Sequence, residues 1–193
     1  KNHREEIIAN PTILIFGVGW NFKSIFIERK LNELMNSGYL VNLAVSRPRG
    51  KLDSPSHKFP IIRITNIFKL DDLIYSLLSF FGLLFFNPGR LLKFLRLIRK
   101  EKGSIKSKFV QVIISLPLIK EMPDLIHFEW ISQALDFEWV FDFFDCPVVV
   151  SSRGRQLNIL PYIPKYEHHV NGLLRILAKS DALHCVCEDI KQQ

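Results

Sequence analysis

Three short segments contain residue types that could bind a phosphate group or a sugar. Residues 17–21 place two glycines after an apolar run, and glycines let backbone N–H groups approach a phosphate closely. Residues 127–130 combine an imidazole, a carboxylate and an indole, which can hydrogen-bond to a sugar and stack on its ring. Residues 151–158 contain two arginines around a glycine, and guanidinium groups bind phosphates and carboxylates in a bidentate manner. The candidate binding residues are Gly17, Gly19, Trp20, His127, Glu129, Arg153, Gly154 and Arg155.

Each of these segments also has a purely structural interpretation, which the sequence leaves open. The two glycines are typical of a tight turn, and Phe22 stands where a G-x-G-x-x-G dinucleotide fingerprint needs its third glycine. His127 could be a core histidine that a neighbour satisfies, beside an exposed Glu129. Residues 151–158 could form a solvated loop.

Metal and redox chemistry find little support in the residue spacing. The sequence contains no H-E-x-x-H motif, no Walker phosphate-binding loop and no G-x-S-x-G nucleophile elbow. Residues 167–169 (Glu-His-His) lack the spacing of metal ligands, so we expect neither a metal nor a cofactor. Cys146, Cys185 and Cys187 include no C-x-x-C pair, which favours buried thiols in a reducing cytosol over disulfides.

Alternating strands and helices must position the candidate residues. An apolar run at 12–19, a helical pattern at 23–36 and an apolar run at 40–45 have the size of one βαβ unit. Further strands are predicted at 61–64, 124–129, 147–151 and 182–186, and helices at 70–86, 88–102, 108–120, 132–144, 162–179 and from 188. This alternation predicts an α/β fold with a Rossmann-like, doubly wound parallel sheet. Ligands of such sheets bind beyond the carboxyl ends of the strands, where all three candidate segments fall.

The strand predicted at 124–129 also orders its own side chains. Because successive residues of a strand point to opposite faces, His127 and Glu129 share one face, and Phe128 and Trp130 share the other.

The positive charge of the chain is concentrated in one segment. The 193 residues include 26 Lys+Arg and 19 Asp+Glu, for a net charge of +7. Residues 87–108 contain eight basic residues and one acidic residue, so this segment carries the entire excess. A hydrophobic content of 48% with 23% charged residues excludes a disordered chain. We expect one domain over residues 1–193, with an apolar and basic helical insertion at 67–108.

The basic segment has the pattern of a membrane-surface helix. Its basic residues recur every three to four positions between leucines, which predicts a basic amphipathic helix. It follows an apolar run at 73–86, which is shorter than the roughly 18–20 residues of a spanning helix. We expect contact with an anionic membrane through Arg90, Lys93, Arg96, Arg99 and Lys100. The alternative is a solvated charged face that packs on the sheet. We expect no nucleic-acid binding, because no nucleic-acid-binding signature accompanies the charges.

Two of the candidate segments resemble motifs of a known family. Residues 123–127 (P-D-L-I-H) are similar to "P-D-[VI]-[VI]-H", with Glu129 in the place of a second His. Residues 147–156 are similar to "P-x-V-x-T-x-H-G-x-D", with Arg153 at the His and Gln156 at the Asp. These are motifs of the N-terminal domain of family 4 glycosyltransferases, of the kind that builds bacterial polysaccharides.

Two further segments extend the resemblance over residues 12–193, most weakly between 47 and 120. Residues 20–41 resemble the family's opening "S-E-T-F-I … L … G-H-x-V", with Ser24 at the acid and Tyr39 at the His. The matching residues are Phe26, Ile27, Leu34, Gly38 and Val41. Residues 178–188 are similar to "A-D-x-[VI]-[IV]-x-V-S-E", with Cys187 at the Ser.

The resemblance implies the N-terminal half of a glycosyltransferase of the GT-B fold, which pairs two Rossmann-like halves. It implies transfer of a sugar from a nucleotide-sugar to a glycan or a lipid-linked acceptor, with retention of configuration and without a metal. This half would bind the acceptor. The donor pocket and its carboxylates would belong to a C-terminal half that this sequence lacks, so we expect the chain alone to be catalytically incompetent. The two arginines would suit a phosphate on a lipid-linked acceptor.

A peripheral location at the cytoplasmic face of the plasma membrane would suit such an enzyme. Two other readings of the sequence compete with this one. The first is a non-catalytic α/β domain of flavodoxin-like topology that docks on a membrane or a partner. The second is a dinucleotide oxidoreductase, which the incomplete glycine fingerprint disfavours.

Overall fold

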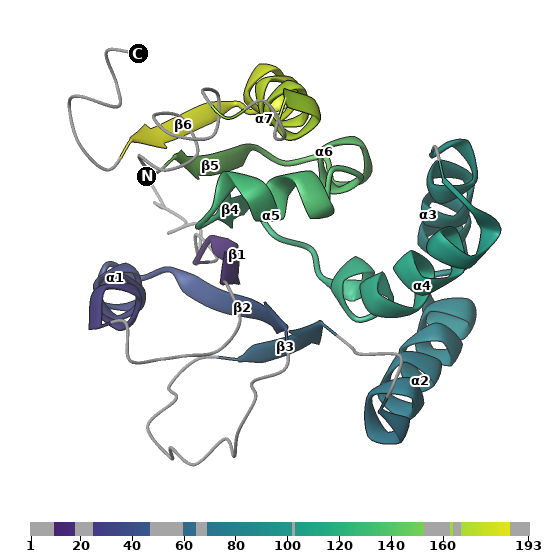
Figure 1. The fold of residues 1–193 in the computed structure, drawn as a ribbon. Helices are drawn as coiled ribbons and strands as arrows, with labels where there is room; N and C mark the ends of the chain where they lie inside the picture. The colour runs from purple at the N-terminus through teal and green to yellow at the C-terminus, as the bar shows by residue number, and fades with distance from the viewer. Residues whose placement is uncertain are drawn as a thin grey trace, which may run out of the picture.

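The computed structural model describes residues 10–17, 25–46, 60–64, 69–101, 103–152, 163 and 167–185. Its centre is a six-stranded sheet in the order β3-β2-β1-β4-β5-β6, in which every neighbouring pair is parallel (Figure 1). The strands are β1 (Thr12–Gly17), β2 (Leu40–Ser46), β3 (Ile61–Ile64), β4 (Leu125–Phe128), β5 (Val148–Ser152) and β6 (Ala182–Cys185). The predicted doubly wound α/β sheet is confirmed, because this is the strand order of the Rossmann fold. A flavodoxin-like topology is wrong, because β4 and not β3 lies beside β1.

Helices cover the two faces of the sheet unequally. On one face, Leu31 of α1 (Ile25–Asn36) packs with Ile13 and Ile15 of β1. The opposite side chains of β1, Leu14 and Phe16, belong to a larger core that includes the later helices. Figure 1 shows α1 on one side of the sheet and α2–α4 on the other. The later helices are α2 (Leu70–Phe86), α3 (Pro88–Lys100), α4 (Ile105–Ser115), the 3₁₀ helix η1 (Leu118–Lys120), α5 (Ile131–Asp136), α6 (Val140–Phe143) and α7 (Glu167–Lys179).

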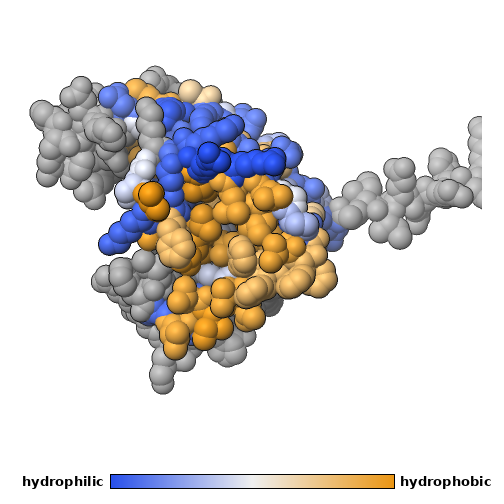
Figure 2. Space-filling view, turned by 90° about the vertical axis from the view of Figure 1, so that its right-hand side faces the viewer, coloured by the Kyte–Doolittle hydropathy of each residue, from blue (hydrophilic) through white to orange (hydrophobic). Residues whose placement is uncertain are grey.

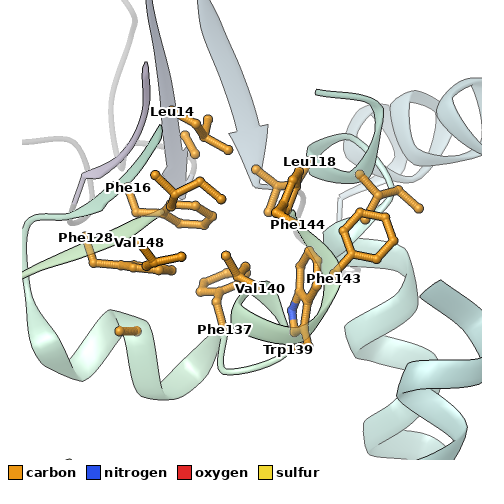
Figure 3. Close-up of a cluster of buried hydrophobic side chains, with 14 of the residues drawn as sticks. Leu14, Phe16, Leu118, Phe128, Phe137, Trp139, Val140, Phe143, Phe144 and Val148 are labelled. Carbon is orange, nitrogen blue, oxygen red and sulfur yellow. The ribbon is translucent and has the colours of Figure 1, made fainter. Parts of the chain in front are cut away.

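Aromatic rings connect the sheet to the helices of the larger core. Phe16 of β1 stacks on Phe128 of β4 with ring centroids 4.4 Å apart. Phe94 of α3 meets Trp139 edge to face at 4.9 Å, and both rings are completely buried. Figure 3 shows how the rings at 137–144 continue from the sheet toward the helices. Helix α3 is therefore anchored in the core, although it carries much of the positive charge.

One predicted helix, at 132–144, is broken in the structure. It forms two short helices, α5 and α6, which are separated by a turn at 137–139. In a continuous helix, residues two positions apart point about 200° away from each other. The turn instead lets both Phe137 and Trp139 enter the same core. Burial of two large aromatic rings thus overrides the helical pattern.

The helix predicted at 108–120 begins earlier and ends earlier. Ser104 caps α4, because its Oγ accepts a hydrogen bond from the backbone N–H of Ser107 at 3.1 Å. Helix α4 ends at Ser115, and η1 follows directly after Pro117. The boundaries predicted for α2 are confirmed, and α3 ends at Lys100.

Candidate functional site

The strand order of the sheet reverses between β1 and β4. At such a point the connections leave in opposite directions, and a crevice opens at the carboxyl ends of the strands. Glu129 directly follows β4 there, and its backbone N–H donates to the carbonyl of Phe16 at 3.2 Å. Gln133 of α5 donates from Nε2 to the carbonyl of Gly17 at 2.9 Å. Gly17, Glu129 and Ser152 thus mark the ends of three adjacent strands, where the three candidate segments begin.

His127 and Glu129 share one face of the sheet, as predicted, and both contact Lys30 of α1. Lys30 Nζ lies 2.5 Å from Glu129 Oε1 and 3.0 Å from His127 Nδ1. Glu129 is only 1% exposed, so the interpretation of this residue as an exposed carboxylate is wrong. A buried carboxylate needs a compensating partner, and the Lys30 ammonium supplies it.

Lys30 is not among the residues predicted from the sequence. Its position on α1 could have indicated its role, because it lies between the inward-facing Ile27 and Leu34 at helical spacing. A lysine at that position belongs to the face of the helix that packs on the sheet.

A chain of hydrogen bonds continues from His127 across the next two strands. His127 Nε2 lies 2.8 Å from Ser151 Oγ on β5, and Ser151 Oγ lies 2.9 Å from His184 Nδ1 on β6. An ammonium group can only donate, so the Nδ1 atom of His127 accepts from Lys30. The neutral ring then carries its proton on Nε2 and donates to Ser151, whose hydroxyl can donate to His184. Lys30 thus sets the direction of every hydrogen bond in this series, because its ammonium group can only donate.

Burial keeps His127 neutral. Desolvation, together with the positive charge of Lys30, lowers the pKa of His127 from 6.5 to about 4. A second histidine, His184, adds to the effect, and Glu129 opposes it. At neutral pH the imidazole therefore has one donor and one acceptor nitrogen, and it carries no charge.

A pocket of about 390 Å³ lies on the same face of the sheet, beside α1. Its polar side chains are those of Lys30, Tyr39, His127 and His184. Its strand residues Ile13, Leu125 and Val149 lie near the amino ends of β1, β4 and β5, so the pocket lies on the α1 face of the sheet and not at the carboxyl ends, where the sequence predicted a ligand. Tyr39 and the aliphatic side chains of the neighbouring strands contribute its apolar wall. Hydrogen-bonding groups on one side and an aromatic or aliphatic wall on the other suit a ligand with hydroxyl groups and C–H faces.

Five predicted binding residues lie outside the described part of the chain. These are Gly19, Trp20, Arg153, Gly154 and Arg155. Of the candidate set, the structure places His127 and Glu129 together in one network, and it places Gly17 at the end of the adjacent strand.

The described cysteines and carboxylates show no metal centre. Among the described residues, no group of three His, Cys, Asp or Glu side chains could hold a metal ion. Cys146 and Cys185 are free, half-buried thiols, and Cys187 lies outside the described residues. Burial raises the pKa of Cys146 to about 11, which disfavours its reactive thiolate form.

The five basic residues predicted to contact a membrane do not share one face. Arg90 is half-buried, and its guanidinium donates to the carbonyls of Ile119 and Glu121. Lys93 is exposed but pairs with Asp145 at 3.1 Å, on the side of α6. The remaining three, Arg96, Arg99 and Lys100, are exposed. The sequence pattern could not distinguish these roles, because they depend on η1 and α6, which follow later in the chain.

No protein-family model and no curated protein matches this chain. The resemblance to family 4 glycosyltransferases therefore rests on the sequence motifs alone.

Proposed function

We propose that this chain is the acceptor-binding half of a retaining glycosyltransferase, which moves a sugar from a nucleotide-sugar to a glycan or a lipid-linked acceptor. The observation that carries the proposal is the network of Lys30, His127 and Glu129 beside a pocket in a Rossmann-type sheet. The motif that contains His127 is also a close match to a motif of the family.

The chemistry of the pocket supports a sugar as its ligand. A sugar hydroxyl both donates and accepts hydrogen bonds, so it can bond to the polar side chains that line the pocket. Lys30 adds a charged donor, and Tyr39 can pack against the C–H face of a sugar ring. In this proposal the chain positions the acceptor, and a second Rossmann-like half supplies the nucleotide-sugar.

Saturation-transfer NMR with the purified chain tests the proposal. The probes are a panel of monosaccharides and disaccharides and, separately, UDP and UDP-glucose. We expect saturation transfer to at least one acceptor sugar and none to the uracil protons. Tyr39→Ala, in the wall of the pocket, should weaken sugar binding by about tenfold. Leu174→Ala, on the exposed side of α7, is the matched control and should leave sugar binding unchanged.

The opposite pattern would contradict the proposal. Binding of the uracil ring, lost in Tyr39→Ala, would assign the pocket to the nucleotide-sugar donor and not to the acceptor. If no sugar in the panel bound, the pocket would no longer support the proposed function.

A non-catalytic docking domain is the second candidate function. The observation that favours it is a row of exposed apolar side chains on α2. A docking surface is compatible with either function.

A further inference from the structure

Helix α2 is packed with its polar side inward. Asp72, Ser76 and Ser79 are at most 3% exposed, although the helix is otherwise almost entirely apolar. The opposite side carries large apolar side chains at helical spacing, and Phe85 among them is 75% exposed. We call this outward stripe the apolar face of α2. Its most regular members are Leu70, Ile74, Leu77, Leu78, Phe81 and Phe85.

A hydrogen bond and a cation–π contact hold the helix in this orientation. Ser76 donates from Oγ to the carbonyl of Ile113 on α4 at 3.0 Å. Lys120 Nζ lies 5.5 Å from the ring centroid of Tyr75, on the same side of α2. A helix turned the other way would bury its leucines but lose these contacts. The outward direction of the apolar face is therefore a property of the packed structure.

Neighbouring helices extend the apolar face. Ile105 and Phe109 of α4 are strongly exposed, and so is Leu92 of α3. Figure 2 shows the side of the molecule formed by α2–α4 as a broad hydrophobic surface, with hydrophilic residues along its upper border. Soluble monomers rarely expose contiguous apolar patches of more than a few hundred Å², and larger ones mark interaction surfaces.

The charges beside the apolar face indicate what binds there. Arg96, Arg99 and Lys100 of α3 are exposed, and Lys106 of α4 adds a fourth basic residue. None of these four has a carboxylate partner among the ion pairs found within the described residues. An apolar surface with a basic border is complementary to an anionic membrane, whose acyl chains and phosphates lie at two adjacent depths.

The geometry of α2 and α3 indicates a position in the plane of the membrane surface. No single helix of the described residues is long and apolar enough to cross a membrane. Only α2 and α3 together pass that test, and they are bent by 119° against each other. Leu91, Phe94 and Ile98 of α3 are buried in the core of the domain, so this half of the pair cannot leave the protein surface.

We propose that the apolar face of α2 inserts between the headgroups of an anionic membrane, and that Arg96, Arg99 and Lys100 bind the lipid phosphates. The principal contact is thus α2, whereas the sequence assigned it to the basic helix. This proposal rests on the packing of α2 and is independent of the proposed sugar site.

Flotation with lipid vesicles tests the proposal on the whole chain. The vesicles are phosphatidylcholine alone and phosphatidylcholine mixed with phosphatidylglycerol. We expect the chain to float with the mixed vesicles and to bind them at least tenfold more tightly than the neutral ones. The double variant Leu78→Glu/Phe85→Glu should lose this binding by more than tenfold. The matched control is Met122→Glu/Leu174→Glu, at two equally exposed apolar residues outside α2–α4, and it should bind as the unchanged chain does.

A second variant tests the basic residues beside the apolar face of α2. Arg96→Gln/Arg99→Gln/Lys100→Gln should weaken binding to the mixed vesicles by about fivefold for each charge removed and should abolish the preference over neutral vesicles. Circular dichroism checks that every variant is folded. Should the Glu variant unfold, Leu78→Gln/Phe85→Gln replaces it, with the same expected loss.

Three results would overturn the proposal. The first is absence of binding by the unchanged chain to mixed vesicles. The second is equal loss of binding in the control variant. The third is a chain that binds no vesicles and forms a dimer in light scattering, which Leu78→Glu/Phe85→Glu converts to a monomer. This result would assign the surface to a second copy of the chain.

Discussion

Polar side chains are buried in two regions of this molecule, at β4 and on α2, and they have different partners. At β4 the buried groups are an imidazole and a carboxylate, and they bond to side chains of α1 and β5 beside a pocket. On α2 the buried groups include two serines, whose hydroxyls bond to backbone carbonyls of α4 and of α2 itself. Side-chain networks beside a cavity indicate a ligand site, whereas serine-to-backbone bonds orient a helix. This difference is the reason that we place the proposed ligand site at β4 and the proposed membrane contact on α2.

The ion pair at β4 should give the largest effect on stability. Lys30→Met removes the cation that pairs with the buried carboxylate of Glu129. We expect a loss of about 4 kcal/mol in the free energy of unfolding, measured with urea. The control is Glu138→Gln, which breaks the surface pairs with Arg175 and Lys179 and should cost at most about 1 kcal/mol for each pair. Equal losses in both variants would contradict the special role of the β4 network.

The pH dependence of stability should follow from His127. Its pKa is about 4 in the folded chain and 6.5 as the ordinary value, so the unfolded state binds more protons between these two pH values. Stability should therefore fall as the pH decreases from about 6.5 to about 4, by up to about 3 kcal/mol from this one residue.

A variant that lacks only His127 isolates this contribution. His127→Asn cannot take up the proton, so its stability should change less over the same interval. Urea unfolding at several pH values measures both chains. Parallel pH profiles would show that His127 is not buried as a neutral base.

The bond between α2 and α4 should give a smaller effect. Ser76→Ala removes the donor to the carbonyl of Ile113, and we expect a loss of about 1 kcal/mol. Ser79→Ala is the matched control, because the bond from Ser79 to Tyr75 lies within the helix. That control should change stability by less than about 0.5 kcal/mol. Identical effects of the two changes would argue against orientation by the Ser76 bond.

The apolar face of α2 should give the smallest effect on stability. Leu78→Gln should shift the free energy of unfolding by less than about 0.5 kcal/mol, because the side chain is mostly exposed. Phe94→Ala, in the buried core, should cost about 4 kcal/mol in the same assay. A large loss in Leu78→Gln would mean that α2 packs with its leucines inward.

Much of the fold could be predicted from the sequence, because its signals are local. Apolar runs gave the strands, and Pro88 after Asn87 separated α2 from α3. Alternation along β4 placed His127 and Glu129 on one face. The break at 137–139 could not be predicted, because it depends on the packing of Phe137 and Trp139 against residues far away in the sequence.

The side chains that contact His127 and Glu129 could not be predicted from the sequence. Lys30 lies 97 residues before His127, and periodicity alone treats a lysine as a surface residue. The orientation of α2 was equally hidden, because a helical pattern shows that two sides differ and not which side faces the core.

The most direct test is hydrogen–deuterium exchange of the unchanged chain, with vesicles and with a sugar added separately. It tests whether α2 contacts the membrane and the pocket beside β4 binds the sugar. Vesicles that contain phosphatidylglycerol should protect amides of α2 and leave β4 and α1 as they are. A sugar that binds in saturation transfer should protect α1, β4 and β5 and leave α2 as it is. Protection of β4 by vesicles, or unchanged exchange of α2 in their presence, would contradict this division.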